Sequence, residues 1–145
     1  MGVARTLTDL DYQQLLEFRT GLRRFLHWSE EQAAAVGLTP AQHQLLLAIR
    51  GFPGHAGPTI GDVADALLLR HHSVGGLVDR AEAAGLVERL PDRNDHRAVR
   101  LRVTPTGLRS LDRLTEAHLT ELAQLAARLR PLWAGLAERG HFAEP

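Results

Sequence analysis

A change in hydrophobic period near Gly85 constrains the fold of this chain more than any other feature. Before it, apolar residues recur at helical spacing in two short stretches, 60–68 and 74–81, separated by a gap at Leu69-Arg70-His71. After it, residues 86–90 have strand character, and residues 99–103 alternate, with the apolar face inward and two arginines outward. A polar turn at 91–96 joins these strands. Two short helices followed by a two-stranded hairpin predict a winged helix-turn-helix.

A helix that precedes this lobe carries its own start and stop signals. Thr39 is a suitable N-cap, Pro40 suits the first helical position, and Gln42 completes a capping box. The apolar run from Leu45 to Ile49 predicts a helix buried on most sides, ended by Gly51. Residues 51–58 are a loop by composition.

Long helices are predicted at both ends of the chain. The first begins at Thr8 or Asp9 and stops at Gly37, and the last begins at Thr104-Pro105 and runs to about Arg130. Each carries a narrow apolar stripe that favours packing against another helix. The stripes consist of Leu15, Phe18, Leu22 and Phe25, and of Leu108, Leu111, Thr115, His118, Leu122, Leu125 and Leu129. A single small lobe cannot cover both stripes, so they predict a homodimer.

Pro131 is expected to break or kink the last helix. A short helix through Arg139 and a frayed tail from Gly140 to Pro145 are expected after it. The predicted fold is therefore mainly helical with a small β wing, in one domain over residues 1–145. The helices at 8–36 and 105–139 form the dimerisation layer, and residues 39–103 form the winged lobe.

Composition excludes several function classes. The 145 residues contain no cysteine, which excludes a disulfide framework, a thiol nucleophile and a cysteine redox switch. The 17 basic residues, all arginine, balance 17 acidic ones, so net charge argues neither for nor against nucleic acid. No basic-then-apolar leader opens the chain, and no apolar run approaches the ~18 residues of a membrane span. We therefore expect a soluble, cytoplasmic protein without a membrane partner.

Specific motifs in the winged lobe carry a family resemblance. They are Leu38-Thr39-Pro40-Ala41-Gln42, Asp62-Val63-Ala64 with Leu67, Val74 with Leu77-Val78-Asp79-Arg80, Gly85-Leu86-Val87, Asp95-His96-Arg97 and Thr104-Pro105-Thr106-Gly107. With these motifs the chain resembles the multiple antibiotic resistance regulator (MarR) family of bacterial transcription factors. The resemblance implies a homodimer that binds double-stranded DNA at a palindromic promoter site, usually as a repressor released by a small ligand.

Two departures from the family pattern bear on DNA contact. Leu68-Leu69 fills a turn that usually carries glycine, and Gly75 and Gly76 replace polar residues that commonly face DNA. Each glycine costs roughly 1 kcal/mol inside a helix, and its reason is either close approach to the DNA backbone or sequence drift. Base contacts then fall on His71, His72 and Ser73, whose alternative role is an ordinary helix cap. The predicted DNA-contacting residues are Arg70, His71, His72, Ser73, Gly75, Gly76, Arg80, Arg93, Asp95 and Arg97.

The wing gives the sharpest of these predictions. An arginine at a hairpin tip, such as Arg97, is suited to the negative potential of a narrow minor groove. Asp95 lies two residues earlier, on the same side of an extended segment, and is expected to hold the Arg97 guanidinium in a forked pair. The alternative is an exposed ion pair worth less than ~1 kcal/mol.

Other chemistry finds little support in the sequence. No nucleophile elbow, phosphate loop or pair of catalytic carboxylates is present, so no enzyme is expected. The eight histidines, including His27, His43 and His118, lack a metal-ligand spacing, and neither a metal nor another cofactor is predicted. A small-molecule effector, by family resemblance an aromatic acid, is assigned to a pocket near Arg24, His27, Trp28, His43 and Leu47. The competing interpretation is a winged-helix protein-interaction module without sequence-specific DNA binding.

Overall fold

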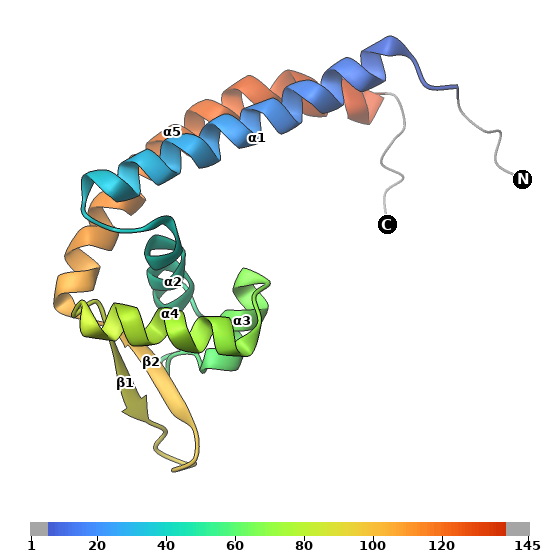
Figure 1. Ribbon diagram of the computed structural model, residues 1–145. Helices are drawn as coiled ribbons and strands as arrows, with labels where there is room; N and C mark the ends of the chain where they lie inside the picture. The colour runs from blue at the N-terminus through green and yellow to red at the C-terminus, as the bar shows by residue number, and fades with distance from the viewer. Residues whose placement is uncertain (1–5, 139–145) are drawn as a thin grey trace, which may run out of the picture. The chain divides into compact units, whose positions relative to one another are not determined.

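The computed structural model describes residues 6–138 (Figure 1). It contains five helices and one two-stranded antiparallel sheet within those residues. The elements are α1 (Asp9–Ala35), α2 (Pro40–Arg50), α3 (Ile60–Leu67), α4 (His71–Ala83), β1 (Val87–Pro91), β2 (Val99–Val103) and α5 (Pro105–Glu138). The chain divides into two compact units. The winged unit is Glu30–Glu116, and the helix-pair unit combines Met1–Ser29 with Ala117–Pro145.

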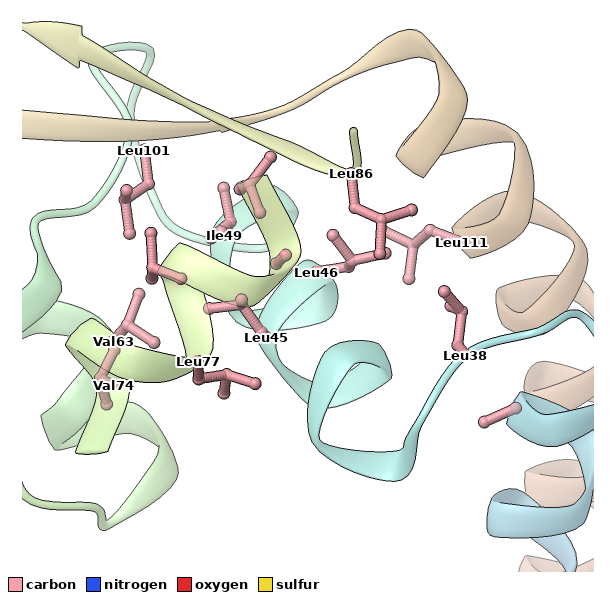
Figure 2. Close-up of a cluster of buried hydrophobic side chains, with 14 of the residues drawn as sticks. Leu38, Leu45, Leu46, Ile49, Val63, Val74, Leu77, Leu86, Leu101 and Leu111 are labelled. Carbon is pink, nitrogen blue, oxygen red and sulfur yellow. The ribbon is translucent and has the colours of Figure 1, made fainter. Parts of the chain in front are cut away.

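The winged unit is built around one apolar core. Leu45 and Leu46 of α2, Val74 of α4, Leu101 of β2 and Leu111 of α5 are all fully or almost fully buried in this core (Figure 2). Capping boxes start two of the surrounding helices, one at Thr39 and one at Thr59. The capping box at Thr39 confirms the predicted start of α2. The one at Thr59 marks where the loop ends and α3 begins.

The wing is a hairpin in which β1 pairs with β2 from Val87↔Val103 to Pro91↔Val99. In Figure 1 it extends away from the three helices α2, α3 and α4. The strand predicted at 86–90 is shifted by one residue to 87–91. Only part of the expected apolar face of β2 points inward: Leu101 is buried, whereas Val99 near the tip is 39% exposed. Among the described residues, Val99 is neither part of the core cluster nor packed against it, whereas Val103 is packed against it.

The helix-pair unit is antiparallel, because α1 residues of rising number contact α5 residues of falling number. Phe18 stacks on Trp133 at a centroid distance of 5.5 Å, and Trp28 packs on His118 at 4.8 Å. Nε2 of the His118 ring and the hydroxyl of Ser29 also form a hydrogen bond of 2.7 Å. The fold is thus mainly helical with a two-stranded wing and contacting terminal helices, as the sequence predicted.

The expectation of a break in the last helix is wrong. Pro131 does not break the last helix, because α5 continues through it to Glu138. The next two residues explain this: Leu132 is buried, and Trp133 stacks on α1, so packing offsets the hydrogen bond that proline removes. Helix α2 buries His43, Leu45, Leu46 and Ile49, in line with a helix buried on most sides, and leaves Leu47 50% exposed. The expectations for Arg139 and for Gly140 to Pro145 lie outside the described residues.

Candidate nucleic-acid interface

The N-terminus of α4 is open to solvent and has no side-chain cap. The helix starts at His71, and its N-cap residue Arg70 makes no capping hydrogen bond. Neither His72 nor Ser73 serves as a cap, which was the alternative interpretation of these residues. His71, His72 and Ser73 are all exposed. Free backbone N–H groups and the positive end of the helix dipole therefore face outward, an arrangement that favours an anion.

One exposed face of α4 continues from this end. His72, Gly76 and Arg80 follow each other at four-residue spacing, away from the buried Val74, Leu77 and Val78. A Cβ atom added at Gly75 would meet nothing within 4 Å, and one added at Gly76 would meet only the flexible end of Arg80. Within the described chain, no neighbour requires glycine at these two positions.

The seven arginines between residues 70 and 102 fall into two groups. Three are neutralised by carboxylates: Arg89 by Asp79 (2.6 Å) and Glu82 (2.9 Å), Arg100 by Asp92 (2.7 Å), and Arg102 by Glu88 (2.6 Å). The hydrogen bond that the Arg89 guanidinium donates to Asp79 is the main cause that raises the pKa of Arg89 above its ordinary value. The other four arginines are exposed and form no ion pair with any residue from 6 to 138. They are Arg70, Arg80, Arg93 and Arg97, the four arginines that the sequence assigned to DNA contact.

The wing tip is organised by Asp92, which the sequence analysis did not single out. Its Oδ1 accepts hydrogen bonds from the backbone N–H groups of Asn94 (2.8 Å) and Asp95 (3.0 Å), and its Oδ2 accepts one from Nε of Arg100 (2.7 Å). The Asn94 N–H bond first, and then Arg100, lower the pKa of Asp92 from 3.8 to about 2. Aspartate two residues before a turn amide is the signal that points to this role.

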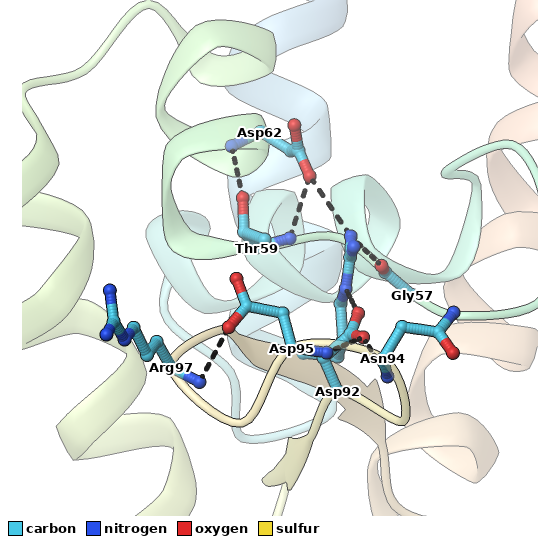
Figure 3. Close-up of polar contacts among 8 residues, drawn as sticks. Gly57, Thr59, Asp62, Asp92, Asn94, Asp95 and Arg97 are labelled. Carbon is cyan, nitrogen blue, oxygen red and sulfur yellow. Dashed lines mark hydrogen bonds and ion pairs between the residues drawn. The ribbon is translucent and has the colours of Figure 1, made fainter.

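Arg100 links the wing to the rest of the winged unit through Asp92, Gly57 and Asp62, which are labelled in Figure 3. Its guanidinium donates to the Gly57 carbonyl (3.2 Å) and lies 3.8 Å from Oδ2 of Asp62. Asp62 is the capping-box carboxylate of α3, and the backbone hydrogen bond from Thr59 is the main cause that lowers its pKa. The end of the wing next to the turn is therefore fixed against the α2–α3 loop and the start of α3.

The expected forked pair between Asp95 and Arg97 does not form. Oδ1 of Asp95 instead accepts a hydrogen bond from the backbone N–H of Arg97 (3.0 Å), and the Arg97 side chain points away from the carboxylate (Figure 3). Asp95 and Arg97 are two residues apart in a tight turn. The Asp95 carboxylate therefore bonds to the nearby backbone amide of Arg97 and not to its guanidinium. Asp95 thus shapes the turn and leaves the Arg97 charge unpaired.

The residues assigned to an effector pocket are only partly brought together. A cavity of 660 Å³ in the helix-pair unit has Arg24 and Trp28 in its lining, together with Phe25 and Leu125. His27 does not line it. His43 and Leu47 belong to the winged unit, where His43 is buried and Leu47 is half exposed.

The described part of the chain holds neither a metal-binding cluster nor a membrane-spanning helix. Residues 6–138 contain no group of three or more His, Asp or Glu side chains placed to hold a metal ion. Within the same range, no helix has the length and hydrophobicity needed to cross a membrane.

Comparison with known protein families gives a match for part of the chain. Residues 36–98, which span α2 to the wing tip, match the model of the MarR family. This part of the chain is therefore similar to the MarR family. MarR proteins are transcription regulators, not enzymes, which agrees with the expectation from the sequence.

One curated relative matches about half of the chain. The HTH-type transcriptional regulator PecS of Dickeya dadantii (strain 3937) is 30% identical over 70 residues, 48% of this chain and 41% of PecS. The match thus spans less than half of that regulator.

Solved structures match nearly the whole chain. A MarR family transcription regulator is 22% identical, with a TM-score of 0.72 over 92% of this chain and 86% of its own. AbsC of Streptomyces coelicolor, also a MarR family regulator, is 22% identical, with a TM-score of 0.66 over 93% of this chain and 99% of its own. A point mutant of S. aureus MepR, solved bound to an oligodeoxyribonucleotide, is 19% identical, with a TM-score of 0.64 over 92% and 96% of the two chains. At these identities the likeness concerns the fold.

Proposed function

We propose that this protein is a DNA-binding transcriptional regulator of the MarR family. In this proposal α4 enters the major groove and the wing reaches the adjacent minor groove. The observation that carries it is the division of the arginines: three are neutralised within the winged unit, and four stay exposed and unpaired on α4 and the wing. The S. aureus MepR mutant of the same fold was solved bound to an oligodeoxyribonucleotide.

The major-groove contact is assigned to the start of α4. The uncapped N–H groups there suit a phosphate, and His71, His72 and Ser73 are the side chains available for base edges. Because no neighbour needs glycine at Gly75 and Gly76, we attribute them to a close approach between the helix and the DNA backbone.

The minor-groove contact is assigned to Arg97, with Arg93 nearby on the sugar-phosphate backbone. An unpaired guanidinium at a protruding tip suits the negative potential of a narrow groove. The contacts of Asp92 and Arg100 hold the turn that presents it. Exposed, unpaired arginines on both elements also favour a polyanion over the protein partner of the competing interpretation.

Salt-dependent DNA binding tests this assignment. The probe is a duplex carrying an inverted repeat from the intergenic region beside the gene, and the readout is fluorescence anisotropy over a series of salt concentrations. Arg97→Gln should weaken binding and lower the slope of log K against log salt by about 0.9 for each wing in contact. Arg102→Gln is the matched control, because Arg102 is also exposed on the wing but is paired with Glu88. Equal binding by Arg97→Gln and the parent would refute the wing assignment.

A homodimer is part of the same proposal and rests on an apolar flank of the helix-pair unit. At about 100° per residue, Leu15, Leu22 and Leu26 project from one side of α1. Leu119, Leu122 and Trp133 project from the corresponding side of α5. All six are at least 37% exposed. We assign this apolar flank (Leu15, Leu22, Leu26, Leu119, Leu122 and Trp133) to a second copy of the chain, which would pair two winged units with a palindromic site.

Repression relieved by a small aromatic acid is the remaining part of the proposal. The 660 Å³ cavity lies on the other side of the helix pair, because Gln13, Thr20 and Arg24 project opposite the apolar flank. Phe25 and Trp28 offer it an aromatic surface, and Arg24 forms no ion pair within residues 6–138. A flat ring with a carboxylate matches that combination.

Calorimetric titration tests the cavity with 2-naphthoate and with its neutral counterpart, 2-naphthalenemethanol. We expect the carboxylate to bind more tightly than the alcohol and to lower DNA affinity. Arg24→Gln should abolish that preference. Arg23→Gln removes the same charge one residue away, outside the lining, and should not. Absence of naphthoate binding, or equal loss in both variants, would refute the effector assignment and leave the DNA-binding assignment standing.

A further inference from the structure

The turn between α3 and α4 contains a leucine in a conformation that favours glycine. Leu68, the C-cap of α3, has φ 54° and ψ 40°, and among residues 6–138 it is the only residue other than glycine with a positive φ. The backbone reason is clear: the N–H of Leu69 bonds to the Ala64 carbonyl (3.0 Å), the pattern that ends a helix through a left-handed residue. A Cβ atom in this region is unfavourable, so glycine would suit the turn better.

The Leu68 side chain gains nothing inside the protein to offset that strain. It is 92% exposed, more than any other large apolar side chain described, and the adjacent Leu69 is 45% exposed. Two unfavourable features therefore coincide at one residue, a left-handed backbone and an apolar side chain in water. Local strain of this kind concentrates at functional sites.

The surroundings of Leu68 indicate what it contacts. Two residues later comes Arg70, an exposed arginine without an ion partner in the described chain, and the uncapped end of α4 begins at His71. The turn is thus continuous with the surface already assigned to DNA. We propose that Leu68 is a DNA-positioning residue that packs on the apolar deoxyribose edge of the backbone beside the phosphate held by Arg70. This inference rests on the proposed DNA-binding function and adds a contact that carries no charge.

Replacing Leu68 with glycine should then raise the thermal stability of the protein and lower its affinity for DNA. Leu68→Gly removes the strain and should raise Tm by about 2–4 °C, yet weaken DNA binding by about threefold to tenfold. The slope of log K against log salt should stay as in the parent, because no counterion-releasing contact is lost. Arg70→Gln should instead lower that slope.

Leu68→Ala is the matched variant. It keeps a Cβ atom in the left-handed region, so Tm should not rise, but it removes the rest of the side chain and should lose as much affinity as Leu68→Gly. If both variants bind like the parent, the proposal is wrong. If only Leu68→Gly loses affinity, a loosened turn is the cause and the contact is again refuted. A parent protein that fails to bind any duplex would refute the proposed function itself, which separates the two failures.

Discussion

At the scale of single residues, Asp92 joins the two ends of the wing tip. Its carboxylate accepts two backbone N–H bonds and one arginine bond, and these keep its pKa near 2 in the folded protein. A carboxylate whose pKa is depressed on folding stabilises the folded state above its ordinary pKa. That contribution is lost as the pH falls toward the folded value.

A pH series of urea unfolding checks this role. Asp92→Asn should be less stable than the parent near neutral pH, because amide nitrogen cannot replace the oxygen that accepts from Arg100. The difference between the two proteins should shrink from about pH 4 to about pH 2, where the parent loses its own carboxylate charge. Asp112→Asn, on an exposed part of α5 away from the wing, should shift the unfolding midpoint little at any of these pH values. A difference that is constant down to pH 2 would contradict the charge assignment.

At the scale of elements, α4 combines a helix-weakening pair of glycines with an open N-terminus. Neither glycine is required by its neighbours, so the sequence of this helix is not optimised for its own stability. Gly107, at the start of α5, is the contrasting case: a Cβ atom there would collide with the Leu86 carbonyl oxygen and approach Cγ1 of Val103 at 2.9 Å. The Thr-Pro-x-Gly motif therefore marks close packing between α5 and the wing.

Alanine substitutions should separate these two kinds of glycine. Gly75→Ala should raise the free energy of unfolding by about 1 kcal/mol, whereas Gly107→Ala should lower it by about 2–4 kcal/mol. Urea titration followed by circular dichroism measures both. If Gly75 lets α4 approach the DNA backbone closely, Gly75→Ala should also bind duplex DNA more weakly despite its greater stability. Unchanged affinity would favour sequence drift at this position.

Sequence patterns identified the elements well, because helix periodicity, capping motifs and strand alternation are local signals. The two capping boxes, the glycine stop at Gly85 and the period change all have their physical cause within a few residues. Whether the last helix continues through Pro131 depends on contacts with α1, about a hundred residues earlier in the chain. No local pattern contains that information.

Local sequence patterns also could not show which arginines form ion pairs and which do not. Arg102 is paired because the hairpin register places Glu88 opposite it, and Arg100 because the turn brings Asp92 within reach. Both facts need the strand register, which the sequence left undefined. The four arginines predicted to touch DNA were chosen by position along the chain, and their contact with DNA stays a prediction.

At the scale of the whole molecule, the apolar flank bears on oligomeric state. Leu26→Glu, which places a charge on that flank beside the α5 residues Leu119 and Leu122, should shift the assembly from twice the 16.0 kDa chain mass toward the monomer. Sedimentation equilibrium measures the change, and operator affinity should fall with it because two linked winged units bind together. Leu47→Glu is the control, since Leu47 is similarly exposed but lies in the winged unit. A parent protein that sediments as a stable monomer would refute the dimer.

The contacts of Arg100 couple the wing to the α2–α3 loop and to α3. Its guanidinium touches the wing tip through Asp92, the α2–α3 loop through Gly57 and the start of α3 through Asp62, while the N–H of Leu101 donates to the Pro58 carbonyl (2.8 Å). These segments share their interactions, so they should open in one cooperative event, with similar hydrogen-exchange rates for the amides of Leu101 and Asp95. A small rotation of α3 would then be passed directly to the turn of the hairpin, which carries Arg97.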